Sequence, residues 1–157
     1  VLGIVHGPAI GVSYVAAKGL GSFRVDASGW HRIHTAALPV RGERPIRLTV
    51  SRRHGLEQLR QFEQAISDNF GAVQSVPAGS AFKICAVAEG LADAYPRFGP
   101  TSEWDTAAAQ VVLEEAGGHL LDQQGRPFCY NQRDTLLNAG FLAVGQEPLR
   151  WLSYWPK

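Results

Sequence analysis

Short apolar runs rich in β-branched residues open the chain. The runs Val1–Val5 and Val12–Ala17 flank a Gly-Pro turn, which predicts an antiparallel β-hairpin. A third short strand is expected at Phe23–Val25. Residues 26–46 contain several Pro, Gly and Arg residues, so we expect them to form an exposed crossing segment.

From Arg47 onward, short apolar runs alternate with stretches in which apolar residues recur every three to four positions. Leu56, Leu59, Phe62 and Ile66 have this helical spacing. Alternating strands and helices indicate an α/β layer, in which helices flank a sheet of parallel or mixed pairing. The expected strands are 47–51, 72–76, 91–95, 119–122 and 141–144, and the expected helices are 55–69, 80–89, 104–116 and 147–154.

The opening strands have no helix of their own to cover them. An isolated hairpin would leave an apolar face exposed to water. The chain also contains no methionine and begins inside an apolar run. We therefore expect residues 1–46 to be the remnant of a truncated N-terminal α+β domain, and residues 47–157 to form a C-terminal α/β domain.

Composition limits the function classes. The 157 residues suffice for one sizeable core, and the net charge of +1 does not suggest a nucleic-acid partner. No apolar run approaches the roughly 20 residues that span a bilayer. We expect a cytoplasmic protein, with peripheral attachment to the cytoplasmic face of the inner membrane as an alternative. The two cysteines, Cys85 and Cys129, are expected to be free thiols.

The helix that follows Trp104 carries the most informative acidic residue. Asp105 lies off the polar stripe of this helix and shares a flank with Ala109, Val112 and Ala116. We therefore expect its carboxylate to point inward, where it needs a partner such as backbone amides or a metal ion. A capping box with Ser102 is one interpretation. A metal ligand or general base is the other, and a hard cation would need further carboxylates that show no matching spacing.

Basic residues occur where predicted elements begin or end. Ser80 resembles a helix N-cap, and Lys83 falls in the first turn beside it, so free amides and an ammonium could bind a phosphate-sized anion. His54 and Arg97 follow predicted strands, where ligands bind in α/β sheets. The alternative for Lys83 is a solvated surface lysine, that for His54 is an exposed basic turn, and that for Arg97 is a surface salt bridge.

These residues resemble a known family. The block from Trp104 to Ala108, followed by Glu115-Ala116-Gly117-Gly118, is similar to the C-terminal signature of the inositol monophosphatase superfamily. The stretches 51–54, 79–85, 88–101 and 137–141 resemble its bacterial 3'(2'),5'-bisphosphate nucleotidase branch. The similarity extends to about Gly145.

The resemblance implies a layered sugar-phosphatase-like fold and a Mg²⁺-dependent, lithium-sensitive phosphatase. Asp105 would be the one metal ligand that the C-terminal half contributes, and His54, Ser80, Lys83 and Arg97 would contact the nucleotide. The family's other acidic ligands belong to an N-terminal glutamate pair and an Asp-Pro-x-Asp-Gly-Thr loop, and this chain has neither motif. No residue of this chain is expected to be catalytic by itself.

The resemblance further implies hydrolysis of 3'-phosphoadenosine 5'-phosphate to AMP and phosphate, in sulfur assimilation or nucleotide recycling. We expect the 157 residues alone to be inactive and to require the missing N-terminal half, with a homodimer as a further option. One alternative is an inositol or fructose phosphate phosphatase. Another is a non-catalytic lobe that binds nucleotide or a protein partner.

Overall fold

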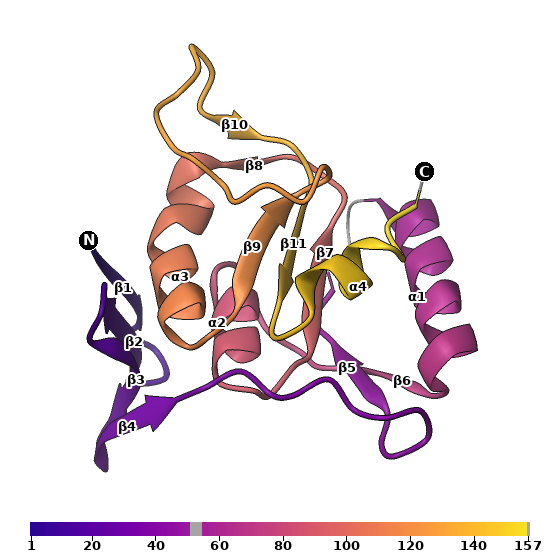
Figure 1. Ribbon diagram of the computed structural model, residues 1–157. Coiled ribbons are helices and arrows are strands. Elements are labelled where there is room, and N and C mark those ends of the chain that lie inside the picture. Colours follow the sequence, from indigo (N-terminus) through magenta and orange to yellow (C-terminus); the bar gives the residue numbers. More distant parts are fainter. Residues whose placement is uncertain (51–54, 157) are drawn as a thin grey trace.

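The first sheet is an antiparallel meander in which the order of strands in space follows the chain (Figure 1). The computed structural model describes residues 1–50 and 55–156. The expected hairpin and third strand are present. The strands of this sheet are β1 (Leu2–Gly7), β2 (Val12–Ala17), β3 (Gly21–Asp26) and β4 (Gly29–Ile33).

Strand β4 corrects the prediction that residues 26–46 form a crossing segment throughout. Trp30 pairs with Val25, and the turn between the two strands is held by a 2.8 Å hydrogen bond from the Ser28 amide to Oδ1 of Asp26. A strand with only one buried residue, Ile33, carries little apolar signal in its sequence. Pairing with β3 supplies the stabilisation that its own pattern does not show.

One face of the first sheet packs on helix α3 (Glu103–Glu115), which begins 70 residues after the last strand of the sheet ends. Val5 and Tyr14 of this face are buried in the same core as α3. A Cβ atom on Gly3 would lie 2.4 Å from the Ala108 carbonyl oxygen, so β1 and α3 are in direct backbone contact. The prediction that the opening strands lack a covering helix is therefore wrong for this face.

The opposite face of the first sheet is exposed. Residues that are directly paired in register share this face, including Ile4 with Val15 and Val25 with Trp30. Leu2, Ile4 and Trp30 are 62%, 52% and 65% exposed. This face matches the expectation of an uncovered apolar surface.

The second sheet has five strands in the order β6-β5-β7-β11-β9. Strands β6, β5 and β7 are parallel, whereas β11 is antiparallel to both β7 and β9, so the mixed sheet expected from the sequence is present. Short strands β8 and β10 form a separate antiparallel pair. The bounds are β5 (Ile46–Leu48), β6 (Val73–Ser75), β7 (Ala94–Arg97), β8 (Thr101–Ser102), β9 (His119–Asp122), β10 (Leu137–Asn138) and β11 (Phe141–Val144).

Two hydrophobic cores lie on the two faces of this mixed sheet. Because side chains alternate along a strand, Tyr95 and Phe141 pack with helices α2 (Phe82–Ala88) and α3, whereas Ala94 and Leu142 face the other way. Helices α1 (Leu56–Phe70) and α4 (Pro148–Leu152) cover that second face. Figure 1 shows α3 between the first sheet and β9, with α1 and α4 on the opposite side of the molecule.

Helix α3 ends where the Gly-Gly pair predicts. Gly117 has φ +89°, a conformation that favours glycine, and its amide donates to the Glu114 carbonyl at 3.0 Å. Gly118 is required for a second reason, because a Cβ atom there would lie 2.7 Å from the Val144 carbonyl oxygen. The glycine stop therefore also allows β9 to approach β11.

The C-terminal segment packs aromatic side chains against α1. Trp151 is buried and stacks on Phe70 with ring centroids 6.2 Å apart, and Tyr154 meets the same ring edge-on. Both cysteines are free, with Cys85 buried and Cys129 exposed. No helix in the described part of the chain is long and apolar enough to cross a membrane.

Candidate functional site

A cavity of about 460 Å³ lies where the start of α2, the end of β7 and the first turn of α3 come together. It falls within the size range of small-molecule sites in proteins. Two cations and one carboxylate contribute to its walls, so its charge suits an anionic ligand. The polar residues that line it are Ser80, Lys83, Tyr95, Arg97, Thr101, Asp105 and Thr106.

Lys83 is the second residue of α2 and lies on the cavity wall as the sequence suggests. Ser80 lines the cavity too, but it is not the N-cap: Ala81 occupies that position and makes no side-chain capping bond. Ser80 instead has φ +46° in the preceding turn. The left-handed backbone turns the chain one residue before the observed N-cap.

The amides at the start of α2 do not form the expected anion site. The Phe82, Lys83 and Ile84 amides donate to the carbonyls of Gly79, Ser80 and Ala81 at 3.0, 3.3 and 3.0 Å. The expectation of free amides is therefore wrong for these three donors, because a tight first turn satisfies them. The Lys83 ammonium remains as the charged donor of this element.

Arg97 ends β7 and lines the same cavity. Its Nε donates to the Gly99 carbonyl at 3.1 Å and its Nη2 to the Pro100 carbonyl at 3.0 Å. These bonds to the loop that follows β7 help to hold the guanidinium at the cavity wall.

Asp105 is exposed, so the prediction that it points inward is wrong. It is the N3 residue of α3, and its Oδ2 accepts a 2.8 Å hydrogen bond from the Ser102 amide within a capping box. A helix start has unpaired amides that attract an acceptor, which draws the carboxylate back toward Ser102. The capping interpretation is thus confirmed, and the carboxylate still lies on the cavity wall.

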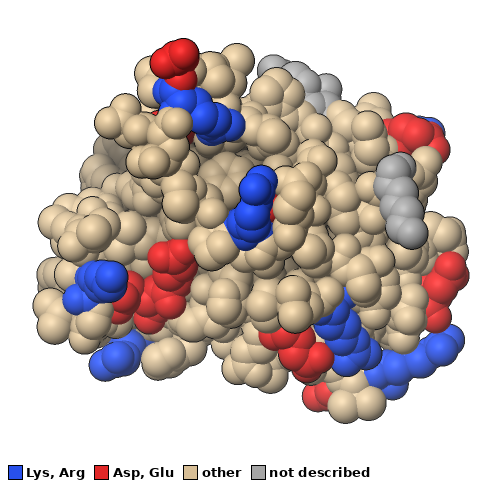
Figure 2. Space-filling view, turned by 45° about the horizontal axis from the view of Figure 1, so that its top comes forward, with Lys and Arg blue, Asp and Glu red and all other residues tan. Residues whose placement is uncertain are grey.

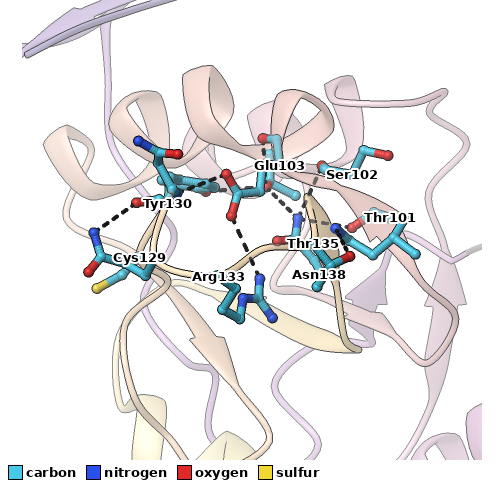
Figure 3. A network of polar contacts seen from close by, with 12 residues as sticks. Thr101, Ser102, Glu103, Cys129, Tyr130, Arg133, Thr135 and Asn138 are labelled. Atoms are coloured by element: carbon cyan, nitrogen blue, oxygen red, sulfur yellow. Dashed lines mark hydrogen bonds and ion pairs between the residues drawn. The ribbon is translucent and has the colours of Figure 1, made fainter.

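Most of the polar stripe of α3 is buried, as is the flank that carries Ala109, Val112 and Ala116. Glu103, Thr106 and Gln110 are 8%, 1% and 7% exposed, because the segment around residues 129–138 crosses over them. Figure 3 shows this network of polar contacts. The Tyr130 hydroxyl bonds Oε1 of Gln110 at 2.5 Å. Distant residues therefore supply the partners that make burial of a polar stripe tolerable.

Glu103 and Asn138 connect this network to the cavity. Oε2 of Glu103 accepts the Asn131 amide at 2.9 Å, and its Oε1 lies 3.7 Å from Nη2 of Arg133. Nδ2 of Asn138 donates to Thr106 Oγ1 at 3.0 Å and to the Ser102 carbonyl at 3.1 Å (Figure 3). These bonds fix the first turn of α3, and Asp105 and Thr106 at this turn line the cavity.

The structure thus brings together Ser80, Lys83, Arg97 and Asp105, and His54 lies outside the described residues. Tyr95 and Thr106 also line the cavity but were missed in the sequence. Tyr95 could have been found from the alternation of side chains along its strand. It lies two residues before Arg97, so the two side chains point to the same face of the sheet.

A metal site needs more acidic groups than this part of the molecule supplies. Across residues 1–50 and 55–156, no group of three or more His, Cys, Asp or Glu side chains could hold a metal ion. Asp105 is one carboxylate, and its bond to Ser102 uses one of its two oxygens. The described residues alone therefore do not form a complete Mg²⁺ site.

Charged side chains are dispersed on the face of the molecule drawn in Figure 2. Blue and red side chains are scattered there and often adjacent, with wide tan areas between them. This face therefore differs from the continuous basic patch of a nucleic-acid-binding protein.

The chain belongs to the inositol monophosphatase family, which its residues 1–149 match. Within that class it is similar to the 3'(2'),5'-bisphosphate nucleotidase CysQ of Escherichia coli strain K12, with 39% identity over 141 residues, which make up 90% of this chain and 53% of the relative. The CysQ nucleotidase of Haemophilus influenzae is 33% identical over 153 residues, covering 98% of this chain and 55% of that protein.

Solved structures agree with this assignment. The crystal structure of CysQ from Bacteroides thetaiotaomicron matches 94% of this chain and 58% of that one, with a TM-score of 0.78 and 30% identity. An inositol monophosphatase from Zymomonas mobilis matches 98% of this chain with a TM-score of 0.75 at 22% identity, a likeness of fold. The chain spans about half the length of the curated relatives it matches.

Proposed function

We propose that this chain is the C-terminal portion of a 3'(2'),5'-bisphosphate nucleotidase, which removes the 3'-phosphate of 3'-phosphoadenosine 5'-phosphate to give AMP and phosphate. The observation that supports it is the convergence of Lys83, Arg97 and Asp105 on one cavity in a chain of this family. Such an enzyme would act in the cytoplasm, in sulfur assimilation or nucleotide recycling.

In this proposal, Lys83 and Arg97 bind the nucleotide. Each presents N–H donors to a phosphate, and together they neutralise part of its charge. Ser80 adds a hydroxyl at the same wall, and His54 is proposed as a further contact. These side chains orient the substrate and do not themselves transfer protons.

The position of Asp105 supports a cation beside the phosphate. A carboxylate on the wall of an anion-binding cavity repels a bound phosphate unless a positive charge lies between them. We propose that Asp105 contributes one ligand to Mg²⁺ in the complete protein, with the other acidic ligands supplied by its N-terminal half. A bound Mg²⁺ would activate water and neutralise phosphoryl charge, and lithium would inhibit such an enzyme.

The 157 residues alone are proposed to bind nucleotide weakly and to lack activity. Calorimetric titration of the chain with adenosine 3',5'-bisphosphate and with inositol 1-phosphate tests the binding proposal. We expect tighter binding of the bisphosphate, and Lys83→Ala or Arg97→Ala should weaken it. Arg126→Ala is the matched control, because Arg126 is exposed and pairs with Asp122 away from this cavity.

Two outcomes would contradict the proposal. Equal binding of both ligands, or tighter binding of the inositol phosphate, would favour an inositol or fructose phosphate phosphatase. Brisk Mg²⁺-dependent release of phosphate by the isolated chain would contradict its proposed inactivity.

A second candidate function is a non-catalytic lobe that binds nucleotide and docks on a partner. The exposed outer face of the first sheet, with Leu2, Ile4 and Trp30, favours it. The partner is proposed to be the remaining half of the same protein, with a second copy of this chain as the alternative. Sizing the chain alone and with the separately produced N-terminal half distinguishes the two. Phosphatase activity of the reconstituted pair would reject the non-catalytic function.

A further inference from the structure

Tyr95 is a buried aromatic residue in the wall of the cavity. It is only 4% exposed, yet it lines the cavity together with Lys83 and Arg97. Tyr95 and Arg97 belong to the same strand, β7, two residues apart, so their side chains leave the same face of the sheet. Lys83 reaches the same place from α2.

The ring of Tyr95 contacts the Lys83 ammonium. Lys83 Nζ lies 5.5 Å from the ring centroid, within the range of a cation–π interaction. The ring itself is fixed by Phe141, which meets it edge-on at 5.3 Å with an interplanar angle of 90°. A ring held by the core can therefore restrict a long, flexible lysine side chain.

The second cation, Arg97, acts on the charge state of Tyr95. Burial raises the pKa of Tyr95, and the positive charge of the Arg97 guanidinium opposes this effect. The phenol is therefore neutral at physiological pH. Arg97 is bonded to the Gly99 and Pro100 carbonyls, which help to define its orientation.

We propose that Tyr95 is a positioning residue that holds the Lys83 ammonium through its ring, so that Lys83 and Arg97 face one ligand with two anionic groups. Preorganised cations lose less conformational entropy on binding than mobile ones. The inference rests on the proposed function, because a nucleoside bisphosphate is such a ligand.

The first test compares two substitutions. Tyr95→Leu removes the ring and the hydroxyl, and we expect the dissociation constant of the chain for adenosine 3',5'-bisphosphate to rise by about tenfold, the scale of a partly desolvated cation–π contact. Tyr95→Phe retains the ring and should restore most of the affinity. Tyr14→Phe is a control, since it removes another buried phenol, bonded to Glu89 at 2.5 Å, that does not line the cavity.

A double-mutant cycle separates positioning from structural support. If Tyr95 acts through Lys83, Tyr95→Leu should have little effect on affinity in a Lys83→Gln background. An equal loss of affinity in both backgrounds would overturn the proposal. So would wild-type affinity in Tyr95→Leu.

A spectroscopic readout does not depend on nucleotide binding. The Lys83 ε-methylene protons should be shifted upfield by the aromatic ring in the wild type and in Tyr95→Phe, and this shift should disappear in Tyr95→Leu. Absence of this upfield shift from the wild type would reject the positioning role of Tyr95 and leave the proposed function intact. Absence of nucleotide binding with the shift present would instead reject the proposed function, and with it the proposed ligand of Lys83 and Arg97.

Discussion

The Ser102 amide donates a 2.8 Å hydrogen bond to Oδ2 of Asp105, which lies on the wall of the cavity that also contains Lys83. One carboxylate thus closes the start of α3 and adds negative charge beside two cations. Capping and metal binding are compatible, because an ionised carboxylate has about four lone-pair sites. Capping needs only an oxygen acceptor, whereas metal binding needs the negative charge, so substitutions can separate the two roles.

Asp105→Asn should preserve the cap and remove the charge. An amide oxygen still accepts the Ser102 hydrogen bond, so we expect the free energy of unfolding of the chain to change little, whereas Asp105→Ala should lower it by about 1 kcal/mol. Urea denaturation measures both. Substituting a residue that only orients a metal ligand typically costs roughly 10–100-fold in activity. In the full-length protein, we expect Asp105→Asn to reduce Mg²⁺-dependent hydrolysis by more than that, because Asp105 is proposed to bind the metal directly. Normal hydrolysis by this variant would contradict metal binding by Asp105 and leave helix capping as its role.

Asp93 should make the fold acid-sensitive. Its buried carboxylate accepts hydrogen bonds from Arg44 Nη1 at 2.7 Å and from the Arg47 amide at 2.8 Å, and these partners hold its pKa below the ordinary value of 3.8 despite burial. Because the folded pKa is the lower one, the stabilisation is present above about pH 4 and is lost as the pH falls through the folded pKa. Urea midpoints measured from pH 7 to pH 2 should show this decline.

Asp93→Asn should reduce that pH dependence and destabilise the chain at pH 7. Both arginines are partly exposed, so the loss should be somewhat below the roughly 3–5 kcal/mol typical of a broken buried pair. Glu57→Gln is the control, because Glu57 pairs with Arg60 at an exposed site and should change stability by less than about 1 kcal/mol. Equal effects of the two substitutions would contradict the role assigned to Asp93.

Gly118→Ala should destabilise the junction between α3 and β9. The added methyl group would lie 2.4 Å from Leu113 Cδ1 and 2.7 Å from the Val144 carbonyl oxygen, and the backbone oxygen cannot rotate away. We expect a loss of about 1–3 kcal/mol in the free energy of unfolding. Gly79→Ala is the matched control, since its new methyl group would meet nothing within 4 Å. Similar thermal midpoints for both variants would refute the close approach.

The two thiols should react at very different rates. Burial raises the pKa of Cys85 to about 12, whereas Cys129 is exposed. Because the thiolate is the reactive form, Ellman's reagent should modify one thiol per native chain and two in urea. Cys129→Ser should leave no fast-reacting thiol in the native state. Rapid modification of this variant would show that Cys85 is accessible.

Local sequence patterns predicted the elements well where burial is one-sided. The spacing of Leu59, Phe62 and Ile66 predicted α1, and all three side chains are buried. The Gly-Pro turn predicted the first hairpin and the Gly-Gly pair predicted the end of α3, because turns depend on local backbone conformation. Strand β4 was missed because its only buried side chain is Ile33, so its pairing with β3 is not visible in its own pattern.

The direction of α3 could not be predicted from its pattern. A stripe of Glu103, Thr106 and Gln110 usually faces water, but here residues 20 to 30 positions away supply hydrogen bonds and bury it. The flank with Ala109, Val112 and Ala116 is buried as well, as expected. The inward orientation expected for Asp105 failed for a local reason, because its carboxylate bonds the Ser102 amide at the start of the helix.

The sequence by itself determined the element types, the family motif around Trp104 and Asp105, and the residues that supply charge at Lys83 and Arg97. These depend on turn residues, periodicity and side-chain chemistry, which are local. Only the tertiary structure decided that α3 covers the first sheet and that Tyr95 lines the cavity together with Lys83. Each depends on contacts between segments far apart in the chain, and such contacts are set by packing of the whole fold.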